Sequence, residues 1–227
     1  MKILSVRKGF QADHSSTSYE FFAVDKALDP ISRKAVAKLS SRARPTKRRV
    51  SFIYNGEWSD LPGGWEPLMR KYYDVMYSES YDWWTLAVAF NTNQDVIEKI
   101  KKHQFRGSDD MGVEVHSKED RIVVSISCRL SADAMGTDEY LGYDVEEDDG
   151  EEDSLETNDN LLDLLVENRK YLQKGDCRLL YGIFEKYGKD SEEVKKEEPK
   201  NIPPPEPSSM IILPKPMKHL LSLLEKI

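Results

Sequence analysis

Runs of apolar residues with a two-residue period predict strands in the first 130 residues. The runs are rich in β-branched and aromatic side chains and end at polar or glycine-containing segments, as strands do. In the last two, more and less apolar residues alternate, which predicts a hairpin with one apolar face. The predicted strands cover residues 2–7, 19–24, 48–54, 83–90, 112–116 and 121–128.

Helical spacing predicts three helices between these strands. The first opens at Asp29-Pro30, because aspartate caps a helix and proline fits its first position. Its apolar residues fall on one face: Ile31, Ala35, Val36 and Leu39. A second helix over residues 67–77 would point Leu68, Tyr72, Val75 and Met76 inward. A third follows the cap signals Asn91-Thr92-Asn93, with Val96, Ile97 and Ile100 at helical spacing.

This order of elements predicts an α+β fold, with helices packed on a mixed or antiparallel sheet. A ferredoxin-like core is one way to arrange it. We expect the apolar positions of the central strand and of the hairpin to share one core: Leu86, Val88, Phe90, Ile122, Val124 and Ile126.

The chain changes character after the core predicted for residues 1–130. Residues 131–160 carry thirteen acids and no base, so they bury too little apolar surface to order themselves. Residues 161–188 predict a helical hairpin, stopped in its middle at Lys174-Gly175. Residues 189–227 form a charged, proline-rich linker and a short helix. The apolar residues of this tail predict packing on the same chain or on a second copy.

Composition and charge restrict the class of protein. The longest apolar runs are too short to cross a bilayer, and no signal-like segment opens the chain, so we expect a cytoplasmic protein without a membrane partner. Cys128 and Cys177 are too few for a disulfide framework and fit a reducing compartment. The net charge of −8 is uneven, because residues 1–50 carry twelve bases against four acids.

Basic and aromatic residues interleave between residues 42 and 65, as in proteins that bind single-stranded nucleic acid. Cations hold the phosphates in such sites and flat rings stack on the bases. The alternative is that the rings belong to the core and the cations are solvated. The candidate binding residues are Arg42, Arg44, Lys47, Arg48, Arg49 and Trp58, beside Phe52, Tyr54 and Trp65.

No motif specifies catalysis, a cofactor or a metal site. Asp13-His14-Ser15 has the residue types of a triad, but consecutive side chains diverge, so a hydrogen-bonded turn is the simpler interpretation. The four histidines are scattered without paired spacing. An alignment of residues 145–156 with a calcium loop lacks a carboxylate at its first position. Trp83-Trp84 and the nearby tyrosines could line a pocket, although such rings more often pack in a core.

Four segments follow one another in the last third of the chain. They are a leucine-rich helix, the sequence Gly175-Asp176-Cys177-Arg178-Leu179-Leu180-Tyr181, a proline-rich stretch at 202–207 and a short leucine-rich helix at 219–224. This pattern resembles uncharacterised bacterial proteins over about the last third of the chain. It departs from them at Ile183-Phe184, where the pattern has a tryptophan. The resemblance implies a bacterial, cytoplasmic protein and no particular activity.

The sequence favours a non-catalytic protein-interaction protein, with a tail that docks on its own body or on a partner. The alternative is a nucleic-acid-binding protein that uses residues 42–49, with the acidic segment competing for that surface. An enzyme is the third alternative, and no motif in the sequence specifies one.

Overall fold

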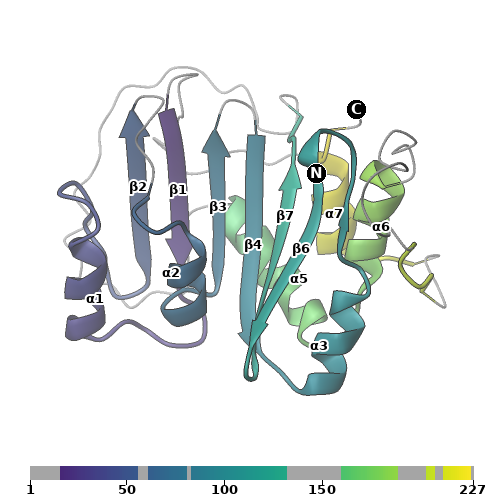
Figure 1. The fold of residues 1–227 in the computed structure, drawn as a ribbon, viewed down its shortest axis with the longest axis horizontal. Helices are drawn as coiled ribbons and strands as arrows, with labels where there is room; N and C mark the ends of the chain where they lie inside the picture. Colours follow the sequence, from purple (N-terminus) through teal and green to yellow (C-terminus); the bar gives the residue numbers. More distant parts are fainter. Residues whose placement is uncertain are drawn as a thin grey trace.

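An antiparallel sheet with the strand order β2-β1-β3-β4-β7-β6-β5 forms the centre of the molecule (Figure 1). The computed structural model describes residues 16–55, 61–80, 83–131, 160–188, 203–207 and 212–225. The strands are β1 (Ser16–Phe22), β2 (Arg49–Asn55), β3 (Val75–Ser80), β4 (Trp83–Asn91), β5 (Phe105–Arg106), β6 (Gly112–Lys118) and β7 (Arg121–Cys128). The α+β class predicted from the sequence is confirmed.

Helices cover both faces of the sheet. They are α1 (Pro30–Ala37), α2 (Glu66–Lys71), α3 (Gln94–Lys101), the 3₁₀ turn η1 (Ser108–Asp110), α5 (Asn160–Leu172), α6 (Arg178–Tyr187) and α7 (Lys215–Leu223). The first two share a core with one face, and α3, α5, α6 and α7 share a core with the other. No helix in the described ranges is long and apolar enough to cross a bilayer.

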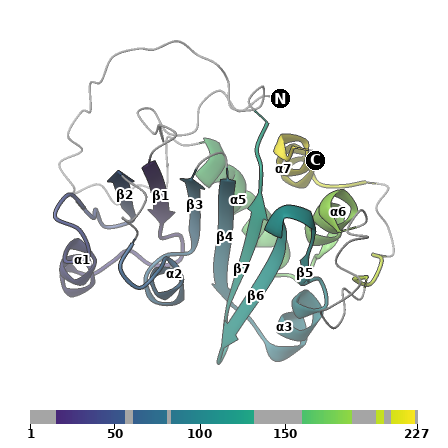
Figure 2. The same cartoon turned by 45° about the horizontal axis from the view of Figure 1, so that its top comes forward.

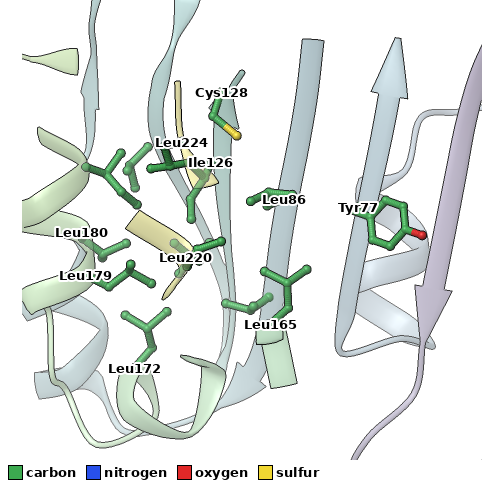
Figure 3. Close-up of a cluster of buried hydrophobic side chains, with 14 of the residues drawn as sticks. Tyr77, Leu86, Ile126, Cys128, Leu165, Leu172, Leu179, Leu180, Leu220 and Leu224 are labelled. Atoms are coloured by element: carbon green, nitrogen blue, oxygen red, sulfur yellow. The ribbon is translucent and has the colours of Figure 1, made fainter. Parts of the chain in front are cut away.

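The larger core joins the middle of the sheet to the C-terminal helices (Figure 3). Leu86 of β4 and Ile126 of β7 are opposite each other across the two strands, and Leu165 of α5 belongs to the same cluster. All six residues expected to share a core belong to this cluster, so that prediction is confirmed. The β6–β7 hairpin is confirmed as well, with Lys118 paired to Arg121 across its two-residue turn.

The helix predicted over residues 67–77 is wrong at its C-terminal half. Helix α2 ends at Lys71, and residues 75–80 form β3 between β1 and β4. Successive residues of β3 point to opposite faces, so Tyr77 enters the larger core and Met76 the smaller one. A strand buried on both faces loses the alternation of polar and apolar residues, which is why the pattern was compatible with a helix.

Helix α1 begins as predicted but does not bury the predicted face. The Asp29 carboxylate accepts a hydrogen bond from the Ser32 amide at 2.8 Å, which confirms the cap. Val36 is buried, whereas Ile31 is 83% exposed and Ala35 is exposed too. This outcome corrects the expectation that the apolar residues of this helix form one packed face.

Two further predictions from the sequence agree with the structure only in part. Strand β1 covers Ser16–Phe22 where residues 19–24 were predicted, so it starts three residues earlier, and these residues pair with β2 and β3. The strands pair antiparallel throughout the described sheet, and a ferredoxin-like core is not confirmed. The predicted strand at 2–7 lies outside the described residues, as does all but the two ends of the acidic segment 131–160.

The C-terminal tail packs on its own chain. Helix α7 lies beside α5 and α6 (Figure 2) and buries Met217, Leu220 and Leu223 in the larger core. Beyond the helix, Leu224 forms an antiparallel bridge with Leu130 at the end of β7. The predicted docking of the tail therefore occurs within one chain.

Candidate interaction surface

Helix α1 presents a mixed apolar and basic stripe to solvent. Ile31, Lys34, Ala35 and Lys38 are all exposed, and their spacing of three and four residues places them on one side of the helix. The opposite side carries Val36, which packs against the smaller core. Ile31, which is exposed on the same side as the two lysines, contributes nothing to the core, so this stripe is available for a contact outside the fold.

The segment after α1 adds positive charge at the same end of the sheet, beside β2 (Figure 1). Arg42 and Arg44 are exposed. One guanidinium nitrogen of Arg44, Nη1, donates to the backbone carbonyls of Ser41 and Ala43, each at 3.0 Å, which holds the side chain against its own loop. Residues 30–47 contain six cations and no carboxylate. We call Ile31, Lys34, Lys38, Arg42 and Arg44 the α1 surface.

The remaining cations predicted to bind nucleic acid have internal contacts. Arg48 Nη1 donates to the carbonyls of Ala23 and Val24 at 3.0 and 3.1 Å, and so ties the start of β2 to the end of β1. Arg49 Nε donates to the buried carboxylate of Glu20 at 3.1 Å. Lys47 is half-buried. The structure thus divides the predicted basic patch into an exposed part and a part that supports the fold.

The aromatic residues predicted beside this patch pack inward. Phe52 is buried in the smaller core and stacks on Tyr54, with 6.4 Å between the ring centroids. Trp65 packs against the same core. Trp58, the ring proposed for base stacking, lies outside the described residues. Among the described rings of this patch, none stands fully exposed beside Arg42 and Arg44.

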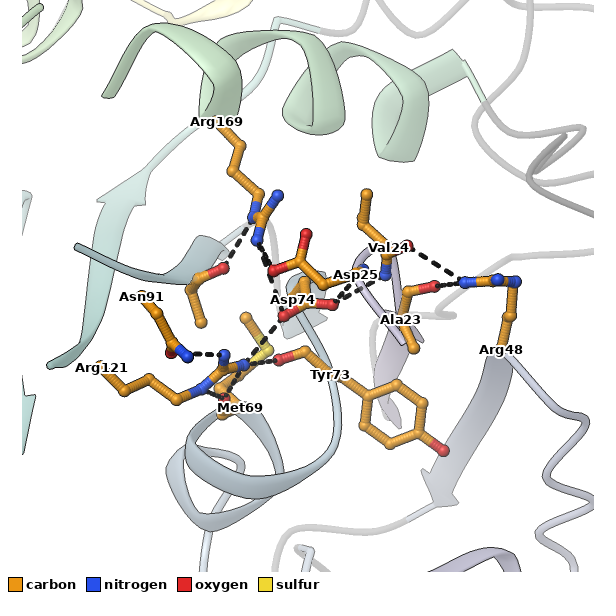
Figure 4. Close-up of polar contacts among 11 residues, drawn as sticks. Ala23, Val24, Asp25, Arg48, Met69, Tyr73, Asp74, Asn91, Arg121 and Arg169 are labelled. Carbon is orange, nitrogen blue, oxygen red and sulfur yellow. Dashed lines mark hydrogen bonds and ion pairs between the residues drawn. The ribbon is translucent and has the colours of Figure 1, made fainter. Parts of the chain in front are cut away.

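A buried carboxylate joins several strands at one end of the sheet (Figure 4). Asp74 is 4% exposed and lies just before β3. Its Oδ2 accepts hydrogen bonds from the amides of Val24 and Asp25 at 2.8 and 2.9 Å. Its Oδ1 accepts from Arg121 Nη2 at 3.0 Å. A buried carboxylate requires such donors, because it has lost its hydration.

Two arginines complete this network. Arg169 of α5 is 3% exposed, donates from Nε to the Ala89 carbonyl at 2.7 Å, and pairs with Asp25 through Nη2. Arg121 at the start of β7 donates to the carbonyls of Met69 and Tyr73 as well as to Asp74. The network therefore joins α2 and α5 to β4, β7 and the segments next to β1 and β3, and its chemistry is that of structural ion pairing. Sequence reasoning missed it, although a lone arginine in a leucine-rich helix was a usable signal.

The described residues hold no group of three or more metal-ligating side chains. Both cysteines are free and buried, and burial raises the pKa of the Cys177 thiol to about 11 and that of Cys128 further. Both thiols are therefore protonated at neutral pH and are poor nucleophiles. The residues Asp13-His14-Ser15 and most of the calcium-loop alignment lie outside the described ranges.

The α1 surface thus combines exposed positive charge with the most exposed large apolar side chain of the described residues, Ile31. Comparisons of the chain with protein-family models, with curated proteins and with solved structures find no match.

Proposed function

We propose that this chain is a non-catalytic protein-interaction protein that binds an acidic segment of a partner protein through the α1 surface. The observation that carries the proposal is the exposed Ile31 on the same side of α1 as the exposed Lys34 and Lys38, in a stretch (residues 30–47) without carboxylates. Basic side chains attract an acidic partner and steer its approach, while an apolar side chain beside them supplies contact area.

A partner protein fits these features better than a nucleic acid does. Phosphate backbones require cations, and bases require exposed rings. Here the described rings pack inward, and two of the five predicted cations, Arg48 and Arg49, bind within the fold. Nucleic-acid binding remains the second candidate because residues 30–47 carry six cations and no acid. The reduced, buried thiols Cys128 and Cys177 support a cytoplasmic location.

Charge reversal of the α1 surface tests the proposal. The triple variant Lys34→Glu, Arg42→Glu, Arg44→Glu should bind a glutamate- and leucine-containing model peptide at least tenfold more weakly than the unaltered protein, by fluorescence anisotropy. The matched control reverses three exposed lysines at the other end of the sheet, Lys102, Lys174 and Lys218, and should retain binding. Equal loss in both variants would show attraction to net charge alone and would contradict the proposal.

A single substitution separates the two candidate partners. Ile31→Ser should weaken peptide binding about three- to tenfold, because the buried contact area of one isoleucine is lost. It should leave the affinity for a single-stranded oligonucleotide unchanged, since phosphate contacts depend on charge and salt. Tight oligonucleotide binding with no response to Ile31→Ser in either assay would favour the nucleic-acid candidate.

A further inference from the structure

A hollow of about 300 Å³ lies at the turn end of the β6–β7 hairpin, on the face of the sheet that carries α2. Arg70 of α2 borders it on one side, and Lys118 and Arg121 of the hairpin on the other, with His116 and Asn91 beside them. The volume is at the lower end of that of small-ligand sites. Three cations from three elements therefore converge on one small space.

The pairing of the hairpin places two of these cations side by side. Lys118 and Arg121 are directly opposite each other across β6 and β7, so both side chains point to the same face. Like charges in that position repel each other and destabilise the pair. Neither Arg70 nor Lys118 has an ion-pair partner among the described residues. An anion between these cations would remove the repulsion.

Arg121 is fixed in place before any ligand arrives (Figure 4). Its Nε and Nη2 donate to the Met69 carbonyl at 3.1 and 2.8 Å, and Nη2 also bonds to Tyr73 and Asp74. The third nitrogen, Nη1, makes one long hydrogen bond of 3.4 Å, to Asn91 Oδ1. A guanidinium has five N–H donors, so Nη1 retains a hydrogen for an oxygen in the hollow.

We propose that this hollow binds the oxyanion group, carboxylate or phosphate, of a small ligand. Arg70 and Lys118 would neutralise the group and Arg121 Nη1 would orient it, as charge-assisted hydrogen bonds do. Glu119 and Asp120 also line the hollow, at the turn, and their carboxylates oppose an anion. Removal of one of these negative charges should therefore strengthen the binding of an anion. The site is separate from the α1 surface and does not depend on the function proposed for it.

Titration with inorganic phosphate and with succinate, at constant ionic strength, tests the site. We expect one of the two to shift the amide signals of residues 118–121 and the Arg121 Nε–H signal in a saturable way, by ¹⁵N correlation spectroscopy. The ligand that saturates identifies the oxyanion class. Arg70→Ala and Lys118→Ala should each raise the dissociation constant about tenfold. This is the loss of affinity expected for one charge-assisted hydrogen bond.

Two further variants make the outcome decisive. Glu119→Gln should tighten binding about threefold, because it removes a repelling charge and keeps the side-chain shape. Lys102→Ala, an exposed lysine on the end of α3, should leave the dissociation constant unchanged. Linear shifts with both ions, or equal effects of Lys118→Ala and Lys102→Ala, would overturn the proposal. The same spectra show that each variant is folded.

Discussion

Asp74→Asn is expected to lower the free energy of unfolding by about 3–5 kcal/mol. The asparagine side chain keeps the shape of Asp74 but removes the negative charge between Arg121 and Arg169. The partly buried Arg121 would lose the carboxylate that it contacts at 3.0 Å, and the buried Arg169 would keep only Asp25. Breaking a buried pair in this way costs more than the pair contributes, because an uncompensated charge remains in the interior. Urea denaturation followed by circular dichroism measures the change.

Asp110→Asn provides a matched control for that experiment. Asp110 also pairs with an arginine, Arg106, but the two side chains are 75% and 62% exposed. An exposed ion pair contributes about 0–1 kcal/mol, so this variant should unfold close to the unaltered protein. Asparagine also tolerates the left-handed backbone of position 110, where φ is 58°. If Asp74→Asn cost no more than Asp110→Asn, the network would not be the structural centre described above.

Removal of residues 208–227 is expected to destabilise the chain by at least about 5 kcal/mol, or to abolish cooperative unfolding. The deleted segment contributes Met217, Leu220, Leu223 and Leu224 to the larger core. Each buried apolar side chain of this size stabilises the fold by about 1.5–3 kcal/mol, and whole domains retain only about 5–15 kcal/mol. Differential scanning calorimetry and sedimentation together measure the loss and any change in oligomeric state.

Point substitutions in the tail distinguish core packing from a general effect of truncation. Leu220→Ala should cost about 2–5 kcal/mol, the range for a large residue replaced in a packed core. Ile212 is 74% exposed, so Ile212→Ala should change stability by less than about 0.5 kcal/mol. A truncated protein with an unchanged melting temperature would mean that the tail adds nothing to the core of its own chain.

Local signals in the sequence predicted the elements that depend on local chemistry. The Asp29 cap, the Asn93 cap of α3 and the β6–β7 hairpin each follow from a few adjacent residues, and the structure has all three. Strand β3 was missed because Val75 and Tyr77 are buried in the larger core and Met76 in the smaller one, so polar and apolar residues do not alternate. The exposed side of α1 was missed because Ile31 has the hydropathy of a core residue.

The candidate sites could be predicted less well than the fold. Arg42 and Arg44 were selected by charge alone, and the sequence could not show that the adjacent Arg48 and Arg49 bind backbone and Glu20 instead. Asp74 and Arg169 are 95 positions apart in the numbering and meet only because α5 crosses β3 and β4. Contacts of that separation depend on the tertiary fold, so no local pattern indicates them.

The bridge between Leu130 and Leu224 has a consequence for synthesis of the protein in the cell. Strand β7 is finished on the ribosome at Cys128, but its core partners in α7 end at Leu223. At 5–20 residues per second, the intervening chain takes roughly 5–20 s to translate. During that interval the nascent sheet displays the apolar surface that α5, α6 and α7 later cover. The larger core therefore cannot close until α7 has been made, and a chaperone could bind the exposed apolar surface until then.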